Sequence, residues 1–178
     1  MELLTAVSYE YWATIILIAA TGFTILWGLD SITHKKLVEV DITDKELQTH
    51  RNILLASVLM ELSLVLMYWW SIEVLPFFIA FLIVRTTHEF IDEIHFHTER
   101  CTPYESNLHL GMWIFVFIKT IAMFMWGFFS NYEGIESLPI YYHVWGIIVF
   151  SVMSYISLME WKRGFPSIKV ALLKMINR

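Results

Sequence analysis

The ten residues 88–97 read His-Glu-Phe-Ile-Asp-Glu-Ile-His-Phe-His and are the part of the chain best suited to chemistry. Imidazoles alternate there with carboxylates, and these are the side chains that bind iron, zinc, manganese or copper ions in proteins. The run closes a stretch apolar enough to lie in a bilayer, where ionisable side chains are costly and usually functional. We therefore interpret it as one part of a metal site within a membrane protein.

Helical phase divides this run into an inward face and a flank. At about 100° per residue, His88, Asp92 and His95 fall on one stripe. We expect this stripe to face the interior of a helical bundle and to supply metal ligands. Glu93 and His97 form an i,i+4 pair on the neighbouring face of the same helix, and such pairs present both side chains together.

Histidines from three other segments are expected to join this wall. Asp30 and His34 form a second i,i+4 pair, while His50 and His109 lie close to the starts of two further apolar stretches. Separate parts of the chain thus converge on one membrane face, whereas His143 lies alone on the other and is expected to be an ordinary interfacial residue. The complete set of candidate metal ligands is Asp30, His34, His50, His88, Glu89, Asp92, Glu93, His95, His97 and His109.

The composition requires membrane helices to position these residues. Hydrophobic residues make up 57% of the 178-residue chain and charged residues only 16%, with a mean hydropathy of +0.59; an average soluble domain is nearer a quarter charged. A crossing helix needs roughly 20 apolar residues. We predict an all-α fold in which residues 1–178 form a single domain, an integral membrane bundle of five transmembrane helices at 8–28, 52–72, 75–97, 107–129 and 141–161.

The distribution of basic residues predicts the orientation of this bundle. Apart from Arg85 and Lys119, every Lys and Arg falls in residues 29–51, 98–106 or the C-terminal segment. By the positive-inside rule, the N-terminus is outside and the C-terminus cytoplasmic. The metal site then faces the cytoplasm, and we expect a bacterial or archaeal inner (plasma) membrane. Residues 166–178 alternate apolar and basic positions and predict a short amphipathic helix on the lipid surface.

A second polar layer is expected deeper in the bundle. Glu61, Arg85 and Lys119 each lie about ten residues, or roughly 15 Å, from the cytoplasmic end of their helix. Two cations and one anion at similar depth predict a buried charge network. We give these three residues as candidate catalytic groups that hold an anionic substrate head group or balance surplus carboxylates; the alternative is a structural ion pair.

Three features of the sequence resemble known metal sites. Asp92-x-x-His95 has the acid-x-x-His spacing of di-iron carboxylate bundles. Histidines gathered at cytoplasmic helix ends resemble the membrane-bound di-iron desaturases and hydroxylases, whose spaced His-box motifs are absent here. Glu93-x3-His97 followed by His109 resembles the intramembrane metal site of the C subunit of particulate methane and ammonia monooxygenases, although the acid there is Asp and the spacing here is one residue short.

These patterns favour an integral membrane metalloenzyme, an oxidoreductase of oxygenase, hydroxylase or desaturase type acting on a lipid-soluble substrate. The cofactor is expected to be a pair of metal ions, with non-haem iron preferred and zinc or copper as alternatives. The expected partners are the lipid bilayer, the substrate, and an electron donor or partner membrane subunits; no motif indicates nucleic acid.

Other functions remain open at the level of the sequence. Histidines at similar depth on different helices could ligate haem b in an electron-transfer protein. The same cage could hold zinc for hydrolysis, line the path of a metal-ion transporter, or belong to a metal-binding subunit of a larger membrane oxidase complex.

Overall fold

The computed structural model describes residues 7–38, 43–97 and 102–163, and the regular structure in these ranges is entirely helical. Within them, the side chains of residues 33–38, 44, 97 and 160–163 are not described. The expected tail helix at 166–178 therefore lies outside the described residues, as do the side chains of His34 and His97.

Four helices of the described chain are long and apolar enough to cross a membrane, which confirms a helical fold suited to a bilayer. The expected crossings at 52–72 and 75–97 both fall in one of these, which consists of the kinked helix α3 and the π-helix that follows it. In chain order the elements are α2 (Tyr9–Val38), α3 (Asp44–Ile91), the π-helix η1 (Asp92–His97), α4 (Pro103–Ser130), the 3-10 turn η2 (Ile135–Ser137) and α5 (Ile140–Arg163).

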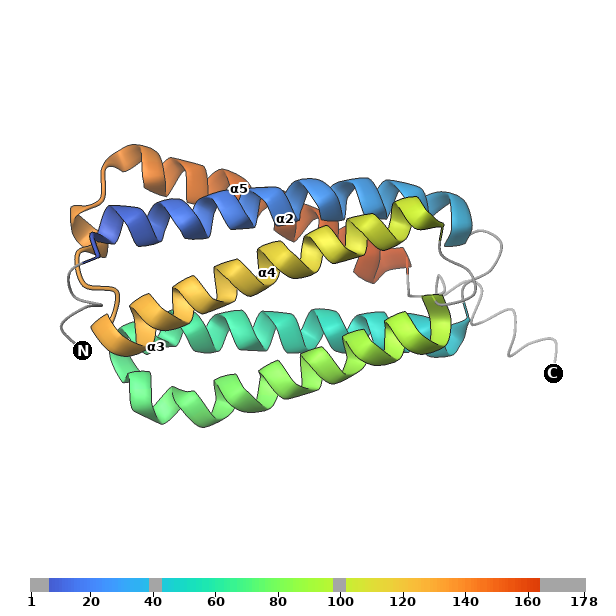
Figure 1. The fold of residues 1–178 in the computed structure, drawn as a ribbon, viewed down its shortest axis with the longest axis horizontal. Coiled ribbons are helices and arrows are strands. Elements are labelled where there is room, and N and C mark those ends of the chain that lie inside the picture. Colours follow the sequence, from blue (N-terminus) through green and yellow to red (C-terminus); the bar gives the residue numbers. More distant parts are fainter. Residues whose placement is uncertain (1–6, 39–42, 98–101, 164–178) are drawn as a thin grey trace.

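Helix α3 is a hairpin of two arms. Its backbone leaves helical geometry at Trp70, where φ is −140° and ψ is 60°, and the chain then runs back beside its own first half (Figure 1). Side chains join the arms along their length, for example Asn52 Nδ2 to His88 Nε2 at 3.0 Å and Arg85 Nε to the Ser57 hydroxyl at 2.8 Å. The reversal comes at Trp70, slightly before the turn expected at residues 72–74.

Local sequence explains where α3 and α4 begin. The Thr43 hydroxyl accepts a hydrogen bond from the Glu46 amide at 3.3 Å and so caps α3. At α4, Thr102 and Glu105 form a capping box: the Thr102 hydroxyl accepts from the Glu105 amide, and the Glu105 carboxylate accepts from the Thr102 amide. Both caps satisfy amides that the first helical turn leaves without partners, so these two helices start at fixed points.

The hydrophobic core lies at the end of the bundle that contains Trp70, which we call the aromatic end (Tyr68, Trp69, Trp126, Tyr132 and Tyr142). The buried cluster there consists of Ala13, Met60, Leu64, Met67, Phe78, Trp126 and Tyr132.

The 131–139 loop closes the aromatic end through two hydrogen bonds to the first arm of α3. The Tyr132 hydroxyl donates to the Leu64 carbonyl at 2.9 Å, and the Asn131 amide donates to the Met67 carbonyl at 3.0 Å. Burial, and secondarily the charge of Glu61, raise the pKa of the Tyr132 hydroxyl, which therefore remains a donor. The loop is thus fastened to the first arm of α3 just before its reversal.

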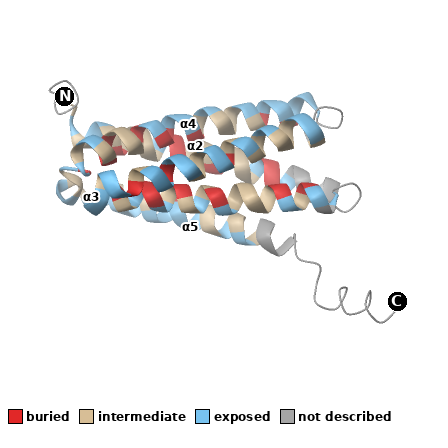
Figure 2. Ribbon diagram, turned by 90° about the horizontal axis from the view of Figure 1, so that it is seen from below, coloured by how far each residue is buried: buried red, intermediate tan, exposed pale blue. Residues whose placement is uncertain are grey.

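Helices α2 and α4 pack closely because glycine lies at their contact. A Cβ at Gly22 would come within 2.6 Å of the Phe115 ring, and one at Gly111 within 2.5 Å of Leu26. Small residues allow this approach in membrane bundles. Helix α5 is more peripheral: it packs on α2 and is joined to it by Trp145 Nε1, which donates to Thr21 Oγ1 at 2.9 Å. Figure 2 shows its mostly exposed surface beside the buried stripes of α2, α3 and α4.

Candidate metal centre

Four helix ends meet opposite the aromatic end. The C-terminal part of α2, the start of α3, η1 and the start of α4 lie together there (Figure 1). We call this the histidine end; its defining side chains are Asp30, Glu46, His50, Asp92, Glu93 and His109.

Glu46, His50 and Asp92 form a compact group at the histidine end. Each offers one ligand atom, and these atoms lie within 4.8 Å of one another. His50 Nε2 is 3.1 Å from Asp92 Oδ2, and Glu46 is wholly buried. The Thr43 hydroxyl accepts a hydrogen bond from the Glu46 amide at the start of α3, and one helical turn later the same face presents His50, so the first arm of α3 supplies two donors and η1 the third.

This group matches what a metal ion requires. Metal–oxygen and metal–nitrogen bonds to zinc are about 2.0–2.2 Å long, so the donors around one ion lie within about 4.4 Å of each other. The ligand atoms of Glu46, His50 and Asp92 lie within 4.8 Å of one another, which is slightly wider than this limit and would need a small movement of the side chains around an ion. Three protein ligands leave positions open for water or substrate, as in catalytic sites.

His109 lies between two carboxylates from other segments. Its Nε2 is 3.3 Å from Asp30 Oδ1 on α2, and its Nδ1 is 3.1 Å from Glu93 Oε2 on η1. Carboxylates approach both nitrogens of one ring, and an imidazolium with two N–H donors satisfies both. His109 therefore links α2, η1 and α4 at the histidine end.

The π-helix η1 brings these two groups next to each other. Asp92 and Glu93 are consecutive, yet the first reaches His50 and the second reaches His109. Single π-helical turns at the ends of α-helices occur frequently at functional sites. Together the two groups contain four carboxylates and two imidazoles: Asp30, Glu46, Asp92, Glu93, His50 and His109.

His88 and Arg85 use their polar atoms within the α3 hairpin. His88 Nδ1 lies 2.8 Å from the Val84 carbonyl, which can only accept, so Nδ1 carries the proton. His88 Nε2 then accepts from Asn52. Arg85 forms an ion pair with Glu89 one turn further along. These residues brace the hairpin beneath the metal-binding group, and the structure does not bring His88 or Glu89 into it.

His95 lies apart from both groups, with an exposed side chain. The expectation that it shares the inward stripe of Asp92 assumed α-helical phase, whereas residues 92–97 are π-helical. A π-helix closes its hydrogen bonds at i→i+5, so its side chains fall out of the α-helical register.

The deeper charges form a separate pair. Lys119 Nζ on α4 is 2.6 Å from Glu61 Oε1 on the first arm of α3. Lys119 is 5% exposed, and its ammonium is 5.9 Å from the centre of the Phe23 ring. Arg85 bonds its own carboxylate instead, so the expected network of three charges is divided into two ion pairs.

Glu46 was not among the candidates from the sequence. The pattern Thr43-Asp-Lys-Glu46 predicts a helix cap, and Glu46 has a second feature besides. Glu46 and His50 form an i,i+4 acid–histidine pair of the same kind as Asp30 and His34. The i,i+4 spacing of an acid and a histidine is therefore a signal in the sequence that identifies Glu46 as a candidate metal ligand.

The chain was compared with known proteins. No family model, no curated protein and no solved structure matches it significantly.

Proposed function

We propose that this protein is an integral membrane metalloenzyme whose metal centre lies at the histidine end. The observation that carries the proposal is the convergence of ligand atoms from Glu46, His50 and Asp92 to within 4.8 Å. In the adjoining group, His109 would have to give up one ring proton, and the freed nitrogen with the carboxylate facing it, Asp30 or Glu93, would then offer donors for a second ion. Four carboxylates with two histidines is also the donor set of di-iron carboxylate bundles.

Charge balance supports a dinuclear centre. Arg85 and Lys119 are each paired with a carboxylate of their own, Glu89 and Glu61 respectively. The four carboxylates of the two groups would be neutralised by two divalent ions. Because the donors are hard oxygens and imidazoles, non-haem iron suits them, and a redox reaction on a lipid-soluble substrate is the activity we favour. His50 and His109 contact carboxylates, which favours this assignment over haem.

Elemental analysis with an optical spectrum tests this proposal. We expect protein purified in detergent to contain about two iron ions per chain and to lack a Soret band. Zinc without iron would exclude the oxidoreductase and leave a hydrolase. A Soret band, or a protein that retains no transition metal when purified from metal-replete cells, would refute the non-haem centre.

We further propose that α3 crosses the bilayer twice, so that the chain has five crossings. Each arm, residues 44–69 and 71–91, exceeds or reaches the roughly 20 residues required. The reversal at Trp70 then lies on the outer face, together with the 131–139 loop, and the histidine end lies on the cytoplasmic face.

Cys101, the single cysteine of the chain, allows this orientation to be tested. It precedes α4 in the sequence and belongs to the cytoplasmic side in the proposed topology. A membrane-impermeant maleimide should label it in inverted vesicles and not in intact cells. In a Cys101→Ser background, Glu133→Cys in the opposite loop should show the reverse pattern. Labelling of Cys101 in intact cells would contradict the topology.

A further inference from the structure

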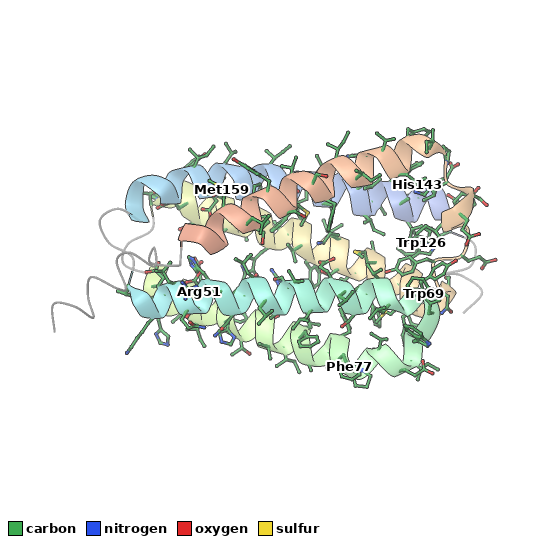
Figure 3. The ribbon with its side chains drawn as sticks, turned by 180° about the vertical axis from the view of Figure 1, so that it is seen from behind. Arg51, Trp69, Phe77, Trp126, His143 and Met159 are labelled. Atoms are coloured by element: carbon green, nitrogen blue, oxygen red, sulfur yellow. The ribbon has the colours of Figure 1, made fainter. Side chains whose placement is uncertain are left out.

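A cavity of about 530 Å³ opens at the aromatic end, far from the histidine end. Its walls come from α2, the first arm of α3, α4, the 131–139 loop and α5. Figure 3 shows Trp69, Trp126 and His143 at this end, and Arg51 at the other. A second cavity of about 400 Å³ adjoins it and shares Ile16, Trp126, Ile135 and His143 with it.

The size and lining of the larger cavity suit a ring-containing apolar molecule. Small-molecule sites are typically about 300–1,000 Å³ and lined by apolar and aromatic groups with few polar ones. The wall here is almost entirely carbon and includes Tyr68, Trp69, Trp126 and Tyr132. Aromatic side chains favour offset or edge-on contact with another ring.

Two lining residues, Glu136 and His143, are exposed and carry polar groups, which meet the cavity at its open side because its wall presents almost no polar surface. Glu136 accepts a hydrogen bond from the Tyr68 hydroxyl at 2.7 Å, so the carboxylate already binds one phenol. A carboxylate has further lone pairs for a second donor. His143, across the cavity on α5, is exposed and has an imidazole that can donate or accept.

We propose that this cavity binds a lipid-soluble phenol or hydroquinone, with its ring among the aromatic walls and its hydroxyl hydrogen-bonded to Glu136. His109 and Trp126 are separated by about 25 Å along α4, so the site is distinct from the metal centre. The inference does not depend on the proposed metal chemistry. A protein without any metal could still bind such a ligand at the aromatic end.

Two probes that differ only at the hydroxyl test the proposal. Calorimetric titration of the purified protein with 4-decylphenol should show saturable binding of one molecule per chain. Its methyl ether, 4-decylanisole, has the same ring and tail but no donor. At equal detergent concentration we expect it to bind about tenfold more weakly, the effect of one hydrogen bond to a charged acceptor. Equal affinities would overturn the proposal and indicate an ordinary lipid-chain groove.

Matched variants locate the binding. Val65→Trp should fill the cavity and abolish binding of both probes, whereas Val84→Trp, an equally partly exposed valine outside the lining, should leave it unchanged. Glu136→Gln should reduce the preference for the phenol to below about threefold, and Glu133→Gln in the same loop should preserve it. Binding that survives Val65→Trp, or a preference that survives Glu136→Gln, would refute the assignment.

Discussion

Substitution of His50 by alanine is expected to lower the affinity of the protein for its metal by about 100-fold or more. His50 is the one imidazole of the group that includes Glu46 and Asp92, and its Nε2 is 3.1 Å from Asp92 Oδ2. Loss of a residue that merely orients a ligand costs 10–100-fold in affinity, and loss of the ligand itself costs more. Competition with a chromophoric chelator, using the detergent-purified protein, measures the change.

His95→Ala provides the matched control for this experiment. It removes the same side chain from η1, beside Asp92 in the sequence, but His95 is exposed and stands outside the group. Its metal affinity should stay within about threefold of the unchanged protein. If His95→Ala weakened binding as much as His50→Ala did, the ligands would be those of the α-helical stripe, and the site described above would be wrong.

The helical architecture was predictable because hydropathy and helix-capping patterns act locally. Long apolar stretches and the Thr43-Asp-Lys-Glu46 capping pattern indicate helices without reference to distant contacts, and the structure has helices at each. The boundaries were less predictable. The reversal of α3 occurs at Trp70, a residue with no turn propensity, where the Asn131 side chain supplies a partner for the Met67 carbonyl. A contact from a loop some sixty positions later is invisible to a local pattern.

In the candidate site, too, some features were predictable from local sequence and others were not. The sequence indicated which residue types would gather at one end, because a bilayer allows charged groups few other locations. Which residues contact each other within the site was predicted from the α-helical repeat. That prediction was wrong at η1, because residues 92–97 are π-helical. His95 was therefore expected inside and is exposed, whereas Glu46, assigned only to capping, is wholly buried beside His50.

Substitution of Lys119 by methionine is expected to lower the free energy of unfolding by about 2–3 kcal/mol, because it leaves Glu61, whose side chain is 29% exposed, without its charge partner. Lys119 is 5% exposed and lies 2.6 Å from Glu61 in the middle of the bundle. The change can be measured by equilibrium unfolding in mixed micelles. Lys45→Met, at an exposed position near the start of α3, should change stability by less than about 0.5 kcal/mol.

A double variant separates a structural role for this pair from a catalytic one. Lys119→Met with Glu61→Leu removes both charges, and replacing a buried ion pair by apolar groups of similar volume is often neutral or stabilising. We expect it to recover most of the stability lost in Lys119→Met and to bind metal as the unchanged protein does, because the pair lies below both carboxylate–histidine groups. Recovered stability with a lost reaction would instead assign the pair to the substrate. A double variant as unstable as Lys119→Met would show that the ion pair is not what stabilises this layer of the bundle.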